Sequence, residues 1–276
     1  MQTSFSGAVT VVTGGASGIG RELCEQLARK GAIVVVADIN GAQAQVVSDG
    51  INATGGRAEV VQVDVAQVAE VERLVNETAQ RHGRIDYMFN NAGIGVAAEF
   101  SDLSLEHWRH LIDVNSMGVL YGTRAAYAIM REQGSGHIVN MASLAGLVPK
   151  PDSTPYTATK HAVVGFTRAL RMEAAQYGVR ASVLCPGFVR TPFYDAAITV
   201  NVDPTRAFGQ KPLGQVGVHA AVTMFLKGVQ KNRGLIVYPR RAKLLWYLDW
   251  FFPRLTDRIG MRMAREFRAL HADRDS

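Results

Sequence analysis

The chain has 276 residues, of which 47% are hydrophobic and 20% charged, with a formal net charge of +6. This composition fits one large α/β domain, or at most two small ones. The start of the chain lacks the pattern of a signal peptide, and no apolar stretch approaches the roughly 20 residues that span a bilayer. Cys24 and Cys185 lie in apolar or helical contexts, which favours buried free thiols over a disulfide or metal site. We therefore expect a cytoplasmic protein.

Short β-branched runs alternate with amphipathic stretches along the chain. The predicted strands are residues 8–12, 33–37, 58–63, 85–90, 137–142, 180–185 and 235–238. The predicted helices are residues 18–30, 42–53, 68–82, 105–133, 156–177 and 217–231. Apolar strands that are each followed by a helix predict an α/β fold, a single Rossmann-type, doubly wound parallel sheet of about seven strands.

Two segments do not fit this alternation, residues 191–214 and the chain after residue 239. No low-complexity stretch, internal repeat or flexible linker divides the rest. We expect one catalytic domain over residues 1–239, with 191–214 as a lid, and a helical extension over 240–276.

The first strand runs directly into a glycine-rich loop, residues 13–20, with the sequence TGGASGIG. Glycines allow a tight turn and let the backbone approach a pyrophosphate, and the following helix offers free N–H groups at its N-terminus. A glycine-rich stretch alone is often only a turn. The position of this one, between the first strand and a helix, predicts a dinucleotide site.

Asp38 ends the second strand, 18 residues after Gly20. An acidic residue at this point binds the adenosine ribose hydroxyls and repels a 2′-phosphate. The alternative role is a cap for the following helix, and both roles can hold. The glycine loop contains no Lys or Arg, and Ile39 follows Asp38, so the sequence favours NAD over NADP.

Tyr156 and Lys160 lie four residues apart, which places them on one face of a helix. A lysine ammonium close to a phenol favours the phenolate, so Lys160 is expected to lower the pKa of Tyr156 toward the range useful for proton transfer. Taken alone, such a pair is most often an ordinary surface contact.

Several further motifs appear in order along the chain, and together they resemble a known family. They are the loop 13–20, Asp64-Val65, the run 90–93 (NNAG), Asn115, Ser143, the Tyr156/Lys160 pair, and Pro186-Gly187 followed by Thr191. Over about residues 7–238 the chain resembles the short-chain dehydrogenase/reductases of the classical type.

The resemblance implies a role for each of four residues. Tyr156 is the general acid/base, and Lys160 binds the nicotinamide ribose and lowers the tyrosine pKa. Ser143 hydrogen-bonds the substrate oxygen, and Asn115 holds a water in a proton relay. The plain alternatives are a serine that caps a turn after its strand and an asparagine that interrupts a long helix.

The resemblance also implies a cofactor site that includes Tyr156 and Lys160. Asp64 and Val65 would contact the adenine, and Val189 and Thr191 the nicotinamide carboxamide. The remaining expected cofactor residues are Gly14, Ala16, Ser17, Gly18, Ile19, Gly20, Asp38, Ile39, Asn91, Ala92, Gly93, Pro186 and Gly187.

The segment that covers the substrate in this family, here residues 191–214, is rich in apolar and aromatic side chains and has few charges. The expected substrate pocket includes Leu144, Val148, Phe188 and Phe193. Such walls suit a lipophilic alcohol or ketone, either a ring system or a long chain. The alternative is that these residues only pack the lid against the body.

The last 37 residues hold nine Lys or Arg and five Asp or Glu, beside a cluster of aromatic residues. A basic amphipathic helix next to aromatics can lie in a membrane interface. A lid over the active site or a subunit contact are the alternatives, and they are compatible with it. We expect no nucleic-acid partner, since the basic residues alternate with apolar ones. His107 and His110 have no further ligands nearby in the sequence, so we expect no metal site.

The sequence thus predicts an NAD-dependent oxidoreductase that acts on a hydrophobic secondary alcohol or ketone, with Tyr156 as general acid/base. The alternatives are an NADPH-dependent 3-oxoacyl reductase, or a non-catalytic nucleotide-sensing or scaffold protein on the same fold. By the resemblance, the helices 105–133 and 156–177 form a homodimer or homotetramer. The added tail favours the dimer, because it could block the second interface of the tetramer.

Overall fold

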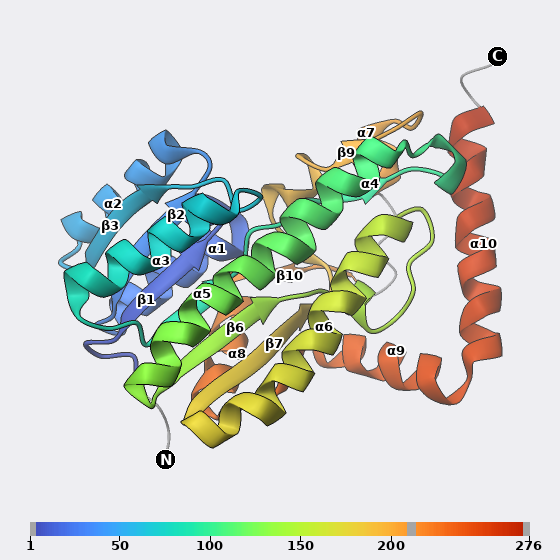
Figure 1. The fold of residues 1–276 in the computed structure, drawn as a ribbon. Helices are drawn as coiled ribbons and strands as arrows, with labels where there is room; N and C mark the ends of the chain where they lie inside the picture. Colours follow the sequence, from blue (N-terminus) through green and yellow to red (C-terminus); the bar gives the residue numbers. More distant parts are fainter. Residues whose placement is uncertain (1–3, 209–213, 273–276) are drawn as a thin grey trace.

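A single parallel sheet forms the centre of the molecule (Figure 1). The computed structural model describes residues 4–208 and 214–272. Seven strands pair in the order β11-β7-β6-β4-β1-β2-β3, and each pairing is parallel. They are β1 (Val9–Thr13), β2 (Ile33–Asp38), β3 (Arg57–Gln62), β4 (Tyr87–Asn90), β6 (Gly136–Met141), β7 (Val179–Pro186) and β11 (Leu235–Tyr238). The predicted doubly wound sheet is confirmed, with strand ends within two residues of those expected.

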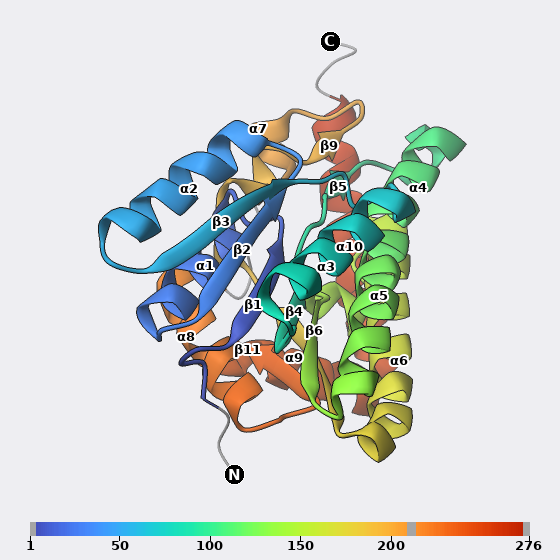
Figure 2. The ribbon, with the colours of Figure 1, turned by 60° about the vertical axis from the view of Figure 1, so that its left-hand side comes forward.

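Helices cover both faces of the sheet, so its central strands are buried on both sides. In β1, for example, all five residues are buried. Figure 2 shows the two layers of helices on either side. One layer contains α1 (Gly18–Arg29), α2 (Gly41–Ala53) and α8 (Val218–Gln230). The other contains α3 (Val68–His82), α5 (Gly118–Gln133) and α6 (Thr154–Ala174).

The helix predicted over residues 105–133 contains a π-helical turn. α4 (Leu105–Ile112) passes into a stretch of π-helix, Asp113–Met117, before α5 begins. The predicted helical range is confirmed at both ends; the π-helical turn inside it was not predicted, because apolar periodicity does not register a single extra residue in a turn. Such π-bulges occur frequently at functional sites, and Asn115 lies inside this one.

Short elements gather beyond the carboxyl ends of the strands. β5 (Val96–Ala97) pairs with β9 (Ile198–Thr199), and β8 (Val189–Arg190) pairs with β10 (Val216–Gly217). Within the part of the predicted lid that the structure describes, the one α-helix is α7 (Pro204–Ala207). Lid residues 209–213 lie outside the described residues. Single 3₁₀ turns lie at Phe100–Asp102, Leu144–Gly146, Ala175–Tyr177 and Pro192–Tyr194.

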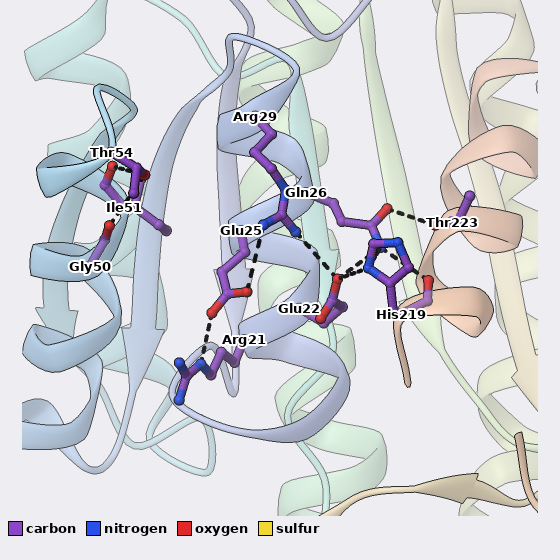
Figure 3. Close-up of polar contacts among 10 residues, drawn as sticks. All are labelled: Arg21, Glu22, Glu25, Gln26, Arg29, Gly50, Ile51, Thr54, His219 and Thr223. Carbon is purple, nitrogen blue, oxygen red and sulfur yellow. Dashed lines mark hydrogen bonds and ion pairs between the residues drawn. The ribbon is translucent and has the colours of Figure 1, made fainter. Parts of the chain in front are cut away.

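A polar contact joins α1 to α8 (Figure 3). The amide of Gln26, which is 5% exposed, donates to the carbonyl of His219 at 3.0 Å and accepts from the hydroxyl of Thr223 at 3.1 Å. Glu22 lies 2.8 Å from Nδ1 of His219. Because this buried amide has its partners, it holds the last helix of the core against the helix that follows the glycine loop.

The C-terminal extension consists of two helices, α9 (Arg240–Phe251) and α10 (Pro253–Ala272), which meet at a sharp turn (Figure 1). Phe267 of α10 is buried against Ala97 and Val202, and Arg268 forms an ion pair with Glu99 at 2.8 Å. The expected helical extension is therefore present. Within the described residues, no helix combines the length and apolar character that crossing a membrane requires.

Candidate active site

The glycine-rich loop closes tightly over the end of β1. Gly14 and Gly18 have left-handed φ angles of +64° and +52°, which favour glycine. A Cβ on Gly20 would overlap the carbonyl oxygen of Gly14, and one on Gly14 would lie 2.8 Å from Cα of Ala92. Ser17 immediately precedes α1, so the free N–H groups of that helix lie at the loop. This arrangement suits a phosphate group.

The carboxylate of Asp38 lies against this loop. Its Oδ2 accepts a hydrogen bond from the N–H of Ala16 at 2.9 Å, and its Oδ1 accepts from the N–H of Asn40 at 3.0 Å. The cap of α2 is Asn40 rather than Asp38. Ile39 is 64% exposed. Asp38 therefore occupies the place, at the end of β2, of the residue that reads the adenosine ribose in dinucleotide-binding folds.

The loop after β4 is tied to the glycine loop. The side-chain amide of Asn91 donates to the carbonyls of Thr13 at 3.0 Å and Gly14 at 3.2 Å. The hydroxyl of Thr13 accepts from the N–H groups of Asn91 at 3.0 Å and Ala92 at 3.2 Å. The side chain of Asn91 thus fixes the loop geometry, which its sequence motif alone did not indicate.

Asp64 and Val65 lie at the end of β3. Asp64 accepts from the N–H of Ala66 at 2.9 Å and donates its own N–H to Glu70 at 2.8 Å. Val65 is 8% exposed and contacts Gly118, where an added Cβ would lie only 3.0 Å from it. Both residues sit at the same edge of the sheet as the glycine loop.

Asn115 is fully buried, and its amide pairs with the backbone of Ile94 in both directions. Nδ2 donates to the carbonyl at 2.9 Å, and Oδ1 accepts from the N–H at 2.8 Å. A Cβ on Gly93 would lie 2.9 Å from Oδ1 of Asn115 and 3.3 Å from Nζ of Lys160. The missing side chain at Gly93 therefore lets these two polar groups approach each other.

Tyr156 and Lys160 lie one turn apart on α6, as predicted. The Nζ of Lys160 donates to the carbonyl of Met141 at 3.0 Å and lies 5.6 Å from the centroid of the Tyr156 ring. Ser143, which follows β6, lies near Tyr156 and accepts from the N–H of Ala145 at 3.1 Å. A hydroxyl, a phenol and an ammonium thus meet at the carboxyl edge of the sheet.

Burial dominates the electrostatics of this group. It raises the pKa of Tyr156 to about 12, and the hydrogen bond with Ser143 offsets only part of that rise. Burial also lowers the pKa of Lys160 to about 8. The expected lowering of the tyrosine pKa by Lys160 is not found: burial is the largest influence on the Tyr156 phenol, and the charge of the lysine is not among the causes of its shift.

Cys185 lies close to both groups, and burial raises the pKa of its thiol to about 12. Both cysteines are free and buried, as expected. No motif in the sequence places Cys185 beside Tyr156.

The loop after β7 returns to the glycine loop. The N–H of Gly187 donates to the carbonyl of Tyr238 at 2.8 Å, and Val189 is 3% exposed. A Cβ on Gly18 would lie 3.3 Å from the Cβ of Thr191. Thr191 therefore lies directly beside the helix start, and the predicted cofactor residues from separate strand ends come to one edge of the sheet.

A row of aromatic rings leads from Tyr156 into the lid. The ring centroid of Phe193 lies 6.0 Å from that of Tyr156 and 5.5 Å from that of Tyr194. Tyr194 in turn contacts Phe188 at 6.2 Å and Phe208 at 5.4 Å. Two of the expected pocket residues, Phe188 and Phe193, belong to this row. The others, Leu144 and Val148, are buried and partly buried.

A cavity of about 40 Å³ lies at the far end of this row, lined among others by Phe188, Lys150 and Phe267. The ammonium of Lys150 donates to Ser153 Oγ at 3.0 Å and to the carbonyl of Pro151 at 3.3 Å, and burial lowers its pKa. Sequence reasoning assigned neither Lys150 nor Phe267 to the site. Phe267 belongs to the apolar face of the amphipathic segment expected in the tail, so the sequence indicated that it could be buried. No local sequence pattern indicated the same for Lys150.

Two histidines singled out in the sequence lie on α4, where His107 accepts the N–H of Ser104 at 3.2 Å. Over residues 4–208 and 214–272, no three His, Cys, Asp or Glu side chains gather in the way a metal ion would require.

An open parallel sheet with a glycine-rich loop before its first helix defines a dinucleotide-binding α/β protein. The model of the short chain dehydrogenase family matches residues 8–199. A cyclohexanol dehydrogenase from Acinetobacter sp. (strain SE19) is 37% identical over 214 residues, which are 76% of this chain and 85% of that protein. A 3-oxoacyl-[acyl-carrier-protein] reductase from Synechocystis sp. is 37% identical over 219 residues, 78% of this chain and 85% of that protein.

Among solved structures, a short chain dehydrogenase/reductase from Burkholderia phymatum in complex with NAD superposes with a TM-score of 0.84 at 31% identity. The match covers 92% of this chain and 96% of that one. This chain belongs to the short-chain dehydrogenase/reductase family, and it is an oxidoreductase that acts on CH–OH groups with a nicotinamide dinucleotide. The predicted family and enzyme class are confirmed.

Proposed function

We propose that this protein is an NAD-dependent dehydrogenase or ketone reductase for hydrophobic secondary alcohols, with Tyr156 as general acid/base. The observation that carries the proposal is the meeting of three groups: Ser143 lies beside Tyr156, and the Nζ of Lys160, from the same helix as the tyrosine, lies 5.6 Å from the centroid of its ring. In a family that oxidises CH–OH groups, two hydroxyl donors side by side suit the oxygen on which charge develops.

The residues of the glycine loop fit a nicotinamide dinucleotide. At Gly14 and Gly20 a Cβ would collide with neighbouring backbone, so only glycine allows the loop to close this tightly at the N-terminus of α1. The bound dinucleotide supplies the hydride acceptor or donor. Ser143 and Tyr156 hold the substrate oxygen, and Tyr156 takes or gives its proton. Asn115 orders a water in the proton path.

The two directions of reaction require Tyr156 in different protonation states. With its pKa raised to about 12, Tyr156 keeps its proton at neutral pH, which suits donation to a ketone. Oxidation of an alcohol needs the phenolate instead. Lys160, whose pKa is about 8, is mostly charged at neutral pH and is the cation that would stabilise that phenolate.

Asp38 supports NAD over NADP, because its carboxylate faces the glycine loop and would repel a 2′-phosphate. Ile39, Asp64 and Val65 would border the adenine in this proposal. The other proposed cofactor contacts are Ala16, Ser17, Gly18, Ile19, Asn91, Ala92, Gly93, Lys160, Pro186, Gly187, Val189 and Thr191.

The proposed substrate is a ring alcohol or ketone. The aromatic row that begins at Phe193 supports an apolar pocket, and a relative is named cyclohexanol dehydrogenase. Leu144, Val148 and Phe188 are the other proposed pocket residues. The second candidate is an NADPH-dependent 3-oxoacyl reductase, favoured by the name of another relative and opposed by Asp38. A non-catalytic scaffold is opposed by the presence of all four catalytic residues.

The proposal extends to assembly and location. We propose a homodimer through residues 105–133 and 156–177, a boundary near residue 239 between catalytic domain and extension, and a cytoplasmic location with peripheral membrane contact through residues 240–276. Exposed apolar side chains such as Leu105 on α4 and Met172 on α6, at 75% and 72% exposure, support the helix-mediated interface.

Substitution Tyr156→Phe tests the mechanism, after a screen of cyclic and long-chain secondary alcohols with NAD and with NADP has identified a substrate by NADH or NADPH absorbance. Removal of the proton donor should lower kcat roughly 10²- to 10⁴-fold with little change in cofactor binding. Tyr177→Phe, at the end of the same helical segment and 43% exposed, is the control and should keep full activity. Retained turnover in Tyr156→Phe refutes the assignment.

A further inference from the structure

The turn between α9 and α10 exposes an unusual concentration of apolar side chains. We define the elbow as residues 250–258. Trp250, Phe251, Phe252 and Leu255 are 72%, 64%, 60% and 46% exposed. Of the twelve residues of α9, only Ala242 is buried. Contiguous exposed aromatics of this kind mark an interaction surface.

Basic residues flank the same surface. Arg254 and Arg258 lie one helical turn apart at the start of α10, and with Phe251 and Phe252 they line a hollow of about 420 Å³. Among the residues that the structure describes, neither guanidinium forms an ion pair, whereas Arg262 and Arg268 are paired with glutamates. The elbow therefore combines apolar area with two unpaired guanidinium groups and one carboxylate, Asp257, which leaves it with a net positive charge.

The other end of α10 is fixed to the catalytic body. Phe267 is 6% exposed, and Arg268 pairs with Glu99 near the short strand β5. Figure 1 shows the arrangement: α10 stands beside the body, and the turn between α9 and α10 lies away from the sheet. The elbow can thus contact a large planar surface without loss of the contacts that hold α10.

We infer that the elbow is a docking site for an anionic phospholipid surface. Its aromatic side chains enter the boundary between headgroups and acyl chains, and Arg254 and Arg258 pair with lipid phosphates. A second copy of the chain is the less favourable occupant, because two apposed elbows would bring together four guanidinium groups and only two carboxylates, those of Asp257, in a protein of net charge +6.

Docking at the elbow would place the substrate side near the lipid. Met263 and Phe267 of α10 line the cavity at the end of the aromatic row, so the helix that contacts lipid also borders the lid. A lipophilic alcohol dissolved in the membrane would then enter close to its pocket. This consequence rests on the proposed function; the docking itself specifies the membrane contact proposed there for residues 240–276, and it can be tested without any activity.

Co-sedimentation of the full-length protein with vesicles tests the inference without any substrate. One vesicle population is phosphatidylcholine alone, and the other contains phosphatidylglycerol as well. The two test variants are Trp250→Ser/Phe251→Ser and Arg254→Gln/Arg258→Gln. Their matched controls are Val46→Ser/Val68→Ser, at exposed apolar positions of α2 and α3, and Arg57→Gln/Arg73→Gln, at exposed arginines of β3 and α3.

The wild type and both controls should sediment with the anionic vesicles and remain in solution with the neutral ones. Loss of two arginines should weaken binding roughly thirtyfold, and loss of the two aromatics at least about tenfold. The inference is overturned by a wild type that stays in solution, by equal binding to neutral vesicles, or by test variants that match their controls. A change in molar mass of the aromatic variant, without vesicle binding by the wild type, would assign the elbow to a second copy instead.

Discussion

The buried ammonium of Lys160 carries a stability cost that a neutral side chain would remove. Lys160 is 2% exposed, and burial lowers its pKa from 10.5 to about 8. One unit of pKa corresponds to about 1.4 kcal/mol, so the charged lysine costs the folded state about 3 kcal/mol at neutral pH. Lys160→Met also leaves the carbonyl of Met141 without its donor, which costs about 1–2 kcal/mol. We therefore expect this variant to be about 1–2 kcal/mol more stable than the wild type at pH 7, and inactive.

The pH dependence follows from the protons bound in each state. From about pH 8 to 10.5 the unfolded chain keeps the lysine proton that the folded protein has lost, so this group makes stability rise with pH. Between pH 7 and pH 9 the wild type should recover roughly 1 kcal/mol relative to Lys160→Met. Tyr156 and Cys185, whose pKa values are raised to about 12, are present in both proteins, so their effects largely cancel in the difference.

Urea unfolding at the two pH values measures this difference. The control is Lys231→Met, at an exposed lysine that ends α8, and its stability relative to the wild type should not change between the two pH values. Two results would contradict the prediction: Lys160→Met is less stable than the wild type at pH 7, or its stability relative to the wild type is the same at both pH values. Either result would show that burial of the charged lysine does not destabilise the folded protein.

Three further substitutions test other parts of the site. Gly20→Ala should abolish cofactor binding because its Cβ meets the loop backbone, whereas Gly50→Ala, with open space around it in α2, should stabilise by about 0.5–1 kcal/mol; dinucleotide titration and thermal unfolding measure both. Asp38→Ser should raise the affinity for NADPH relative to NADH, and an unchanged ratio would contradict its role. Phe267→Ala should cost about 3 kcal/mol and change the ranking of alcohols, while Met261→Ala, 58% exposed on the same helix, should do neither.

The sheet could be predicted because each strand is a short apolar run bounded by turn signals. The seven strands carry their information locally, and the crossover rule orders them. The π-helical turn at Asp113–Met117 could not be predicted from local sequence. It contains Asn115, whose side chain hydrogen-bonds to the backbone of Ile94, 21 residues away. A contact of that kind leaves no periodic trace in the chain.

For the proposed catalytic residues Tyr156 and Lys160, too, one property could be predicted from the sequence and another could not. The spacing of Tyr156 and Lys160 fixes their common face, and the structure keeps it. Their protonation depends instead on how much water surrounds them. Burial raises one pKa and lowers the other, so the two groups move toward their neutral forms. The position of Lys150, on the loop before α6, could not be predicted because nothing in the local sequence marks it as partly buried.

The tail could be recognised as an amphipathic helix, but its orientation depends on contacts with distant parts of the chain. Glu99 and Arg268 are 169 residues apart, and their pairing turns Phe267 toward the body. With the C-terminal end of α10 held in this way, the aromatics at its start remain outside. The lid and the proposed membrane contact would therefore not compete for one surface, because each would use a different end of the same helix.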